Sequence, residues 1–171
     1  MNLDDLPPAE VMWEGKFVRA LRRGKWEYAS RARDIRAVVI LAEFEGKVVL
    51  VDQPRVAPDC RCLELPAGLV GDQDPDATIE GTAVKELEEE TGFTAERIER
   101  LGEFYSSPGM LSEGFTLVRA HALRQIGPGG GDENEDINVH LVTRADIANF
   151  VEQKRAEGFG VDAKLLLLLN F

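Results

Sequence analysis

Residues 83 to 93 read AVKELEEETGF, a stretch in which four of eleven residues are glutamates. Apolar residues recur every four positions at Ile79, Ala83 and Leu87, which predicts an amphipathic helix with one apolar side. Gly92 is a typical residue for the end of such a helix. The helix therefore carries a dense group of carboxylates close to its own C-terminus: Glu86, Glu88, Glu89 and Glu90.

The helical spacing places Glu86 and Glu90 one turn apart on the same face, with Glu89 beside them. Like charges at this spacing repel, and negative charge is unfavourable at the C-terminal end of the helix dipole. Most glutamate-rich helices are solvated acidic surfaces. The alternative is a site for a hard divalent cation such as Mg²⁺, which binds one or two carboxylates, several waters and phosphate oxygens. The surrounding sequence has to decide between these two interpretations.

The composition limits the possible partners and location. The length of 171 residues suits one globular domain, and the net charge of −11 argues against nucleic acid or a membrane as partner. The start, MNLDDLPPAE, lacks the basic and apolar segments of a secretion signal. Cys60 and Cys62 are the only cysteines, and we expect both to be reduced thiols. We therefore expect a cytoplasmic protein.

The remaining patterns predict a mixed α/β fold. Apolar runs such as AVVIL at 37–41 and VVLV at 48–51 are typical of strands covered on both faces. Strands are expected at residues 16–20, 26–30, 35–44, 47–53, 63–65, 98–105, 115–123 and 137–142, with a loop at 66–75. Two further helices are expected, from Thr143 to about Gly158 and from Asp162 to Asn170. A mixed sheet with about three helices implies an α/β sandwich.

The glutamate helix and its flank, LELPAGLVGDQDPDATIEGTAVKELEEETGF at 63–93, resemble the Nudix box, G-x5-E-x7-R-E-U-x-E-E-x-G-U, where U is a bulky apolar residue. Residues 85–93 match its second half, with Lys85 in place of the usual arginine. The first half departs from the pattern. Either Gly68 opens the box and three extra residues follow, or Gly71 opens it and Ala77 replaces the first glutamate.

The resemblance extends to the ADP-ribose pyrophosphatase branch of the Nudix hydrolases and to its relatives that hydrolyse GDP-mannose. The stretch SSPGMLSEGF places Pro108 sixteen residues after Gly92, as in that branch. The segments GGGDENEDINVHLVTRADI and AKLLLLLNF are also similar. The resemblance implies a Nudix-type α/β/α sandwich with a catalytic domain at 35–171. It also implies an N-terminal antiparallel hairpin arm at 1–34 that forms a homodimer.

The resemblance further implies a metal site and a catalytic loop. Glu86 and Glu90 are the implied ligands of Mg²⁺ or Mn²⁺, with Glu89 binding a second ion or its waters and assisting catalysis. The Ala67 carbonyl would complete the set. Glu133 is the implied general base and Glu135 a possible metal ligand, although the two could be exchanged. A solvated acidic loop is the alternative interpretation of these last two residues.

Four residues are candidates for substrate binding. Arg55 lies where relatives place an arginine that binds phosphate or ribose, a task for which a guanidinium is well shaped. Its alternative is a surface salt bridge. Trp26 and Glu27 match a region that recognises the base in some relatives, although Trp26 could equally belong to a dimer core. Glu113 would contact metal-bound substrate or brace its loop.

Three functions follow from the sequence. The leading one is divalent-metal-dependent hydrolysis of the pyrophosphate bond in a small nucleoside diphosphate sugar, namely ADP-ribose to AMP and ribose 5-phosphate. The second is hydrolysis of GDP-mannose or another nucleotide sugar. The third, of a different class, is a Nudix-fold nucleotide sensor without turnover, which the retained glutamates argue against.

Overall fold

The protein is described by a computed structural model over residues 2–33, 35–72, 74–133 and 135–169. Its main sheet has the strand order β11-β6-β5-β4-β9-β8, with β10 paired to β5 and β7 paired to β4. The pairs β4–β9 and β6–β11 are parallel and the other pairs are antiparallel. The strands are β4 (Arg36–Phe44), β5 (Lys47–Arg55), β6 (Cys60–Glu64), β7 (Ala67–Val70), β8 (Phe93–Tyr105), β9 (Gly114–Gln125), β10 (Asn138–Thr143) and β11 (Gly160–Val161). The predicted mixed sheet is confirmed.

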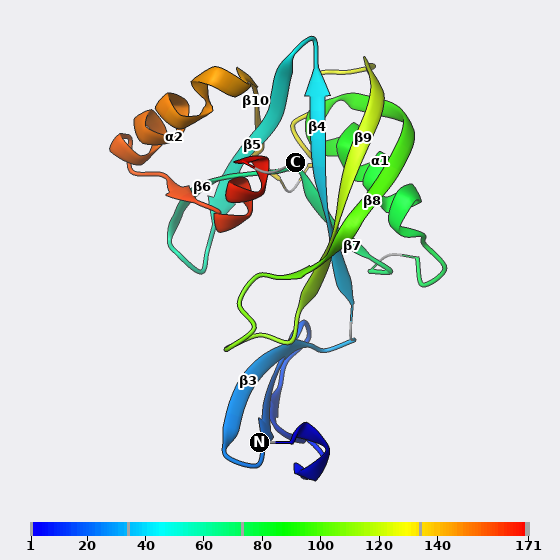
Figure 1. Ribbon diagram of the computed structural model, residues 1–171, viewed down its shortest axis with the longest axis vertical. Coiled ribbons are helices and arrows are strands. Elements are labelled where there is room, and N and C mark those ends of the chain that lie inside the picture. Colours follow the sequence, from blue (N-terminus) through cyan, green and yellow to red (C-terminus); the bar gives the residue numbers. More distant parts are fainter. Residues whose placement is uncertain (1, 34, 73, 134, 170–171) are drawn as a thin grey trace.

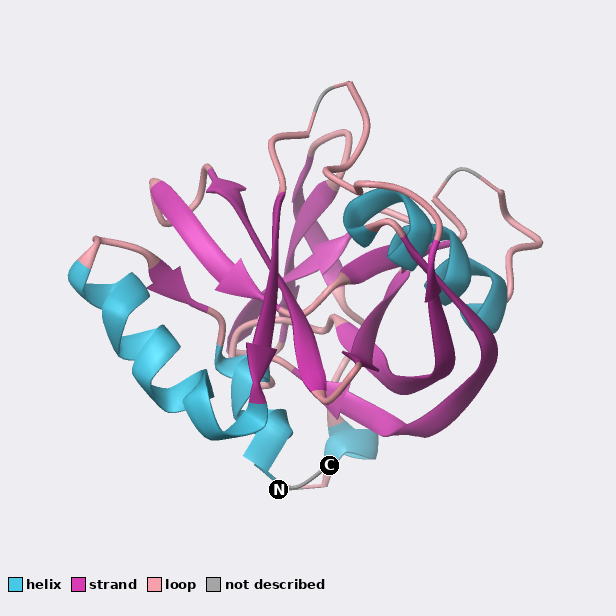
Figure 2. Ribbon diagram, turned by 90° about the horizontal axis from the view of Figure 1, so that it is seen from above, coloured by secondary structure: helices cyan, strands magenta, loops and turns pink. Residues whose placement is uncertain are grey.

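Helices cover both faces of this sheet (Figures 1 and 2). On one face, helix α1 (Ile79–Thr91) packs through Ala83 and Leu87 against Val38 and Ile40 of β4. On the other face, Val39 and Leu41 of the same strand pack in a second core. Helix α2 (Ile147–Ala156) and the 3₁₀ helix η3 (Ala163–Leu169) cover that second core. Alternate residues of β4 thus enter opposite cores, which explains its continuous apolar run and confirms the α/β/α sandwich.

The N-terminal residues form a separate antiparallel sheet. It contains β1 (Glu10–Glu14), β2 (Val18–Arg23) and β3 (Trp26–Arg31), after a short 3₁₀ helix η1 (Leu3–Asp5). Figure 1 shows this sheet in blue, standing off one end of the main body. The predicted hairpin corresponds to β2 and β3, and β1 is an additional strand. Backbone bonds between Ala29 and the segment 110–112 join the two parts.

Further elements differ from the sequence prediction, including the unpredicted strand β11 and the earlier start of β8 at Phe93. The segment 66–75, predicted as a loop, contains β7, which pairs with β4. The helix predicted from Thr143 is a 3₁₀ turn, η2 (Arg144–Asp146), followed by α2, and the Thr143 side chain makes no capping bond. The last predicted helix is the 3₁₀ helix η3, and Asn170 lies outside the described residues.

The glycine-rich stretch at 127–131 packs against the C-terminal end of α1. The backbone N–H groups of Gly130 and Gly131 donate to the carbonyl oxygens of Glu90 and Glu89, at 2.8 and 3.0 Å. These bonds satisfy helix carbonyls that have no partner within the helix. The approach is so close that a Cβ on Gly129 would lie 2.4 Å from the Thr91 carbonyl carbon. Glycine at this position therefore allows the loop to reach the helix.

We predict that Gly129→Ala destabilises the protein, because the methyl group would meet backbone atoms and the φ of +70° disfavours a side chain. The expected loss is about 2 kcal/mol or more in the free energy of unfolding, which is a melting temperature lower by about 5 °C. The matched control is Gly127→Ala, where a Cβ meets nothing within 4 Å. Equal melting temperatures for the two variants, measured by calorimetry, would contradict this account of the loop.

Candidate active site

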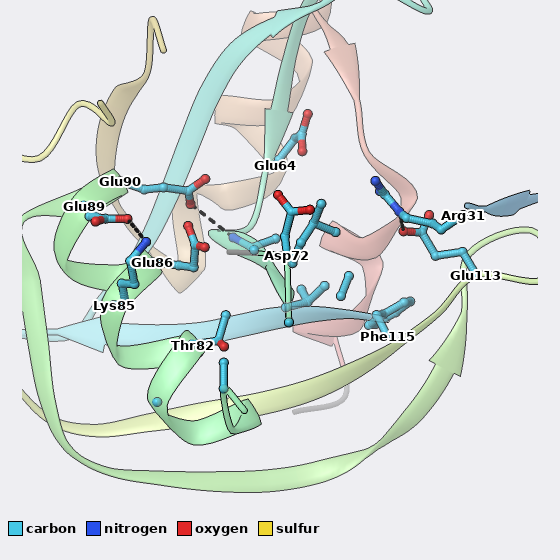
Figure 3. A pocket seen from close by; sticks show the side chains of 18 of the residues that line it. Arg31, Glu64, Asp72, Thr82, Lys85, Glu86, Glu89, Glu90, Glu113 and Phe115 are labelled. Atoms are coloured by element: carbon cyan, nitrogen blue, oxygen red, sulfur yellow. Dashed lines mark hydrogen bonds and ion pairs between the residues drawn. The ribbon is translucent and has the colours of Figure 1, made fainter. Parts of the chain in front are cut away.

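The C-terminal half of α1 lies beside a cavity of about 1040 Å³. This volume is large enough for a nucleotide-sized ligand. Its lining comes from α1 and the segment before it, β7, β4, the ends of β3, β5 and β6, the start of β9 with the loop before it, the loop 127–136 and η3. Figure 3 shows the glutamates of α1 on one side of this space and the Arg31 and Glu113 side chains on another.

Two close backbone approaches bring Glu86 and Glu90 together. The Glu90 side chain is only 4% exposed, and its Oε2 accepts a hydrogen bond of 3.1 Å from the backbone N–H of Ala67 (Figure 3). At the next residue, a Cβ on Gly68 would lie 2.2 Å from Cδ of Glu86. The absence of a side chain at Gly68 therefore lets Glu86 pack directly against β7. The start of β7 thus lies next to both carboxylates, with Ala67 beside Glu90 and Gly68 beside Glu86.

The electrostatics of this pair are unfavourable without a cation. Burial raises the pKa of Glu90 to about 8. The negative charges of Glu86 and Glu135 also raise this pKa, whereas the hydrogen bond from the Ala67 N–H lowers it. Burial also raises the pKa of Glu86. In the described part of the chain, neither carboxylate forms an ion pair with a basic side chain. A buried carboxylate is costly unless it is protonated, paired or bound to a metal.

Glu89 is in a different state, because its carboxylate pairs with Lys85 one turn earlier at 2.7 Å. The hydrogen bond to Glu89 raises the pKa of Lys85.

Among the described residues, no group of three or more His, Cys, Asp or Glu side chains is gathered as a complete ion site. Mg²⁺ needs only one or two protein carboxylates, since water and phosphate fill its other positions. The carboxylate oxygens of buried Glu90 and half-buried Glu86 therefore fit a hard divalent cation.

Three basic side chains from other elements also line the cavity, and each is paired with a carboxylate. Arg55 donates from Nε and Nη2 to the two oxygens of Glu64, each at 2.7 Å, and Glu64 is buried. This paired geometry fixes the guanidinium and leaves Nη1 outside the pair. Arg31, from the N-terminal sheet, donates to Glu113 at 2.6 Å. Lys164 of η3 also lines the cavity, and its Nζ pairs with the carboxylate of Asp162.

Seven of the ten predicted site residues line this one cavity. They are Ala67, Glu86, Glu89, Glu90, Arg55, Glu113 and Glu135. Glu133 is exposed on its loop and is not among the described lining residues. Trp26 and Glu27 are exposed on β3 and also lie outside the described lining. Of the two loop glutamates, the structure therefore brings Glu135 to the helix glutamates.

Several lining residues were missed from the sequence. Arg31, Gln53, Lys164 and Phe115 come from four different elements and belong to no local motif. Asp72, Asp74 and Asp76 precede α1 and line the cavity, and Asp72 pairs with Arg33. Only the alternating acids before the helix gave a sequence signal. The others depend on contacts between distant strands, which no spacing rule reveals.

A model of the NUDIX domain family matches residues 32–161. The chain is 37% identical over 138 residues to the ADP-ribose pyrophosphatase of Bacillus subtilis (strain 168), which covers 79% of this chain and 70% of that protein. It is 37% identical over 143 residues to the GDP-mannose pyrophosphatase of Cronobacter sakazakii (strain ATCC BAA-894), covering 78% and 71%.

Two further similarities extend over most of the chain. The methanol dehydrogenase activator of Bacillus methanolicus is 35% identical over 171 residues, with 95% of this chain and 88% of that protein covered. A crystal structure of an ADP compounds hydrolase superposes with a TM-score of 0.67, covering 86% of this chain and 82% of that one. Its sequence identity is 22%, so this last similarity concerns the fold alone.

We predict that Glu90→Gln stabilises the metal-free protein in a pH-dependent way. The pKa of Glu90 rises from an unfolded value of 4.5 to about 8 on folding. Its contribution to stability is therefore fully present below pH 4.5 and is lost as the pH rises through about 8. In EDTA, the melting temperature of Glu90→Gln should exceed that of the wild type by a margin that grows between pH 5.5 and 8.5.

The control for this titration is Glu88→Gln, which removes a charge from the same helix outside the described cavity lining. It should show no such growing margin. If the difference in melting temperature between Glu90→Gln and the wild type stays constant across this range, the metal-free protein does not bury the Glu90 carboxylate.

Proposed function

The chain belongs to the NUDIX family and is a Nudix hydrolase; from this premise, we propose that it hydrolyses the pyrophosphate bond of a nucleoside diphosphate sugar. The substrate we propose is ADP-ribose, which gives AMP and ribose 5-phosphate. The observation that carries the proposal is the pair formed by buried Glu90 and half-buried Glu86 in one nucleotide-sized cavity. Neither carboxylate forms an ion pair with a described basic side chain. A cavity lined by these carboxylates and by a few guanidinium and ammonium groups suits an anionic diphosphate accompanied by cations.

The metal in this proposal is Mg²⁺ or Mn²⁺. It would be held by Glu86, Glu90 and the Ala67 carbonyl oxygen. Glu89 would release Lys85 and bind a second ion or its waters. When bound, the ions neutralise the diphosphate and lower the pKa of the attacking water. The chemistry of the donor set supports this choice, because carboxylate and carbonyl oxygens are hard ligands.

The chain's own residues hold the substrate and accept the proton. Glu135 lies on the loop that lines the cavity, so we infer that it, rather than Glu133, acts as general base. In the present conformation its Oε2 accepts the Asp132 N–H at 3.1 Å, and this bond would break as the side chain turns to the water. Arg55, held by Glu64, would bind a phosphate oxygen, and Glu113 would orient Arg31 at the cavity wall.

The relatives also support GDP-mannose as the alternative substrate, because the similarity to GDP-mannose pyrophosphatases is of the same size. A nucleotide sensor without turnover is the third possibility. The sensor receives less support, since Glu86, Glu89 and Glu90 all line the cavity.

Incubation of the purified protein with Mg²⁺ and a panel of nucleoside diphosphate sugars separates these three functions. We expect AMP release from ADP-ribose, measured by ion-exchange chromatography. Glu90→Gln should lower kcat by about 100-fold or more, since even groups that only support a metal ligand contribute about 10- to 100-fold. Glu88→Gln is the matched control and should retain activity. A preference for guanine sugars would overturn ADP-ribose, and no release from any sugar would favour the sensor.

We also propose that residues 1–34 form a dimerisation arm and that residues 35–171 form the catalytic domain. All five residues of β1 are exposed, and the N-terminal sheet exposes Val11, Trp13, Phe17 and Trp26. A three-stranded sheet with this much exposed apolar surface is typical of a protein interface. Trp26 and Glu27 lie outside this chain's described cavity lining, so as substrate contacts they would serve the cavity of the partner subunit.

In the part of the chain that the structure describes, no helix is both long and apolar enough to cross a membrane. Cys60 and Cys62 are free thiols with their Sγ atoms 3.9 Å apart, and burial raises the pKa of Cys62 to about 11. Free thiols suit a reducing compartment, and we propose the cytoplasm.

We predict that Trp13→Asp converts the homodimer to a monomer, because it places a charge on an apolar surface that would be buried between subunits. Light scattering after gel filtration should show the mass falling by about half. Val56→Asp is the control, since Val56 is 96% exposed at the β5–β6 turn, away from the arm. A wild-type protein that is monomeric at micromolar concentration would contradict the arm's proposed role.

A further inference from the structure

Glu135 lies on a loop that is fixed at both ends. Before it, the Gly130 and Gly131 N–H groups bind the end of α1, as described above. After it, the loop passes Asp136 and enters β10 at Asn138. Between these ends, the segment's own backbone bonds are longer, with Glu135 N–H to Asp132 at 3.1 Å and Ile137 N–H to Gly130 at 3.4 Å. The second anchor therefore decides how firmly Glu135 is placed.

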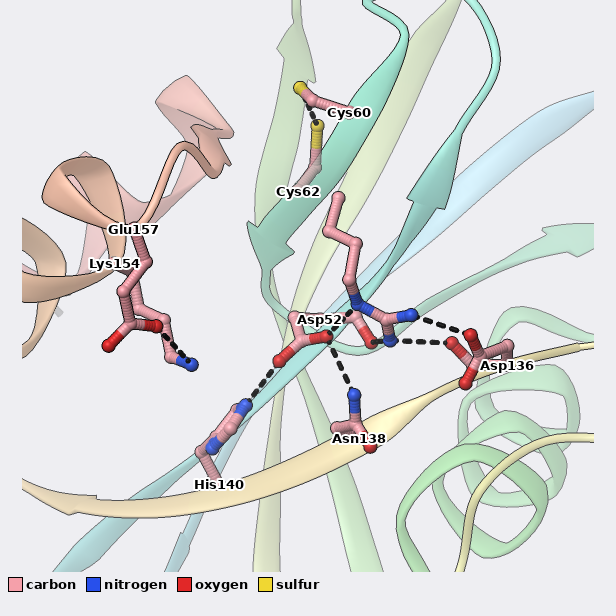
Figure 4. A network of polar contacts seen from close by, with 9 residues as sticks. Asp52, Cys60, Cys62, Asp136, Asn138, His140, Lys154 and Glu157 are labelled. Carbon is pink, nitrogen blue, oxygen red and sulfur yellow. Dashed lines mark hydrogen bonds and ion pairs between the residues drawn. The ribbon is translucent and has the colours of Figure 1, made fainter.

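That second anchor is the guanidinium of Arg61, on β6, which bonds to both Asp52 and Asp136. Figure 4 shows these two aspartates with Asn138 and His140. On the loop side, Nη1 donates to Oδ2 of Asp136 at 2.6 Å and Nη2 donates to the Asp136 carbonyl at 2.8 Å. On the sheet side, Nε donates to Oδ1 of Asp52 at 2.7 Å and Nη2 also donates to the Asp52 carbonyl at 3.2 Å. All three nitrogens thus bridge strand β5 to the residue that follows Glu135.

The sheet side of this bridge is rigid and charged. Asp52 is 1% exposed, and it also accepts hydrogen bonds from Asn138 at 3.0 Å and His140 at 2.5 Å, both on β10. Burial alone would raise the pKa of Asp52, but the bonds from Asn138, His140 and Arg61 lower it below its ordinary value. Asp52 is therefore an ionised, fully bonded anchor for the guanidinium.

We propose that Arg61 is a positioning residue for hydrolysis, which holds the Glu135 segment at the cavity through Asp136. The inference rests on the role proposed above for Glu135. A general base must lie within about 3 Å of the proton it accepts, and small displacements are costly in rate. Arg61 touches neither substrate nor Glu135, since its bonds are to Asp52 and Asp136. Its effect must therefore pass through the backbone of residues 135–136.

The test variant is Arg61→Lys, which keeps a positive charge against buried Asp52 but cannot bridge both partners as the planar guanidinium does. We expect kcat to fall by about tenfold, the scale of one lost charge-assisted bond, with KM changed by less than about twofold. Arg97→Lys is the matched control, because Arg97 is 60% exposed and pairs with Glu99 at 3.6 Å on β8. Asp136→Ala is a second variant that removes the loop carboxylate without changing the buried partner.

A double-mutant cycle separates positioning from general stabilisation. If Arg61 acts through Glu135, Arg61→Lys should add almost nothing to the effect of Glu135→Gln. Fully additive losses would overturn the positioning role while leaving the assignment of Glu135 intact. If Glu135→Gln alone retains full kcat, the assignment of Glu135 fails, and the positioning role fails with it.

Hydrogen exchange gives a readout that does not depend on activity. In Arg61→Lys, the amides of Glu135 and Ile137 should exchange about tenfold faster or more, while amides in β4 keep their wild-type rates. Unchanged exchange at these two amides would overturn the proposal whatever the activity. A wild type that splits no nucleotide sugar would contradict the proposed function, and the exchange rates would still show whether Arg61 holds the segment.

Discussion

The burial of the Glu90 carboxylate against β7 is the constraint on which the rest of the site depends. Its single backbone donor, the Ala67 N–H, does not offset the cost of burial, and its pKa rises accordingly. The side chain also lies in the last turn of α1, where negative charge opposes the helix dipole. The fold stabilises this arrangement with local features, including β7, the bare backbone at Gly68 and the glycine loop on the helix end. None of these features supplies a positive charge, which is why a cation fits there.

The cavity distributes charge in a way that suits a metal-bound diphosphate. Glu86, Glu89 and Glu90 line it from α1, while Arg55 and Lys164 line it from β5 and η3, each paired with a carboxylate. Arg55 is fixed by buried Glu64, so its guanidinium is oriented before a ligand arrives. The loop that carries Glu135, the proposed base, is attached to both sides of the sandwich, through the end of α1 and through Arg61 on β6. The same sheet that forms the two cores therefore sets the distance between the proposed metal ligands and the proposed base.

The sequence predicted the features that depend on local pattern. The apolar spacing of α1, its end at Gly92 and the two-sided burial of β4 follow from residues close together in the chain. β1 and β7 were not recognised, because short strands gain their stability from distant partners rather than from their own composition. For the same reason, the roles of Arg31, Lys164 and Arg61 were not predicted, because they depend on contacts between residues far apart in the chain. The sequence also left Glu133 and Glu135 interchangeable, since only the path of the loop decides which one lines the cavity.

Diffraction from crystals soaked with Mn²⁺ and a non-hydrolysable nucleotide sugar tests the central claim most directly, because Mn²⁺ gives an anomalous signal. The account predicts an anomalous peak within about 2.5 Å of carboxylate oxygens from both Glu86 and Glu90, with diphosphate oxygens completing its coordination. A nucleotide bound in the cavity with no peak at these two side chains would contradict it.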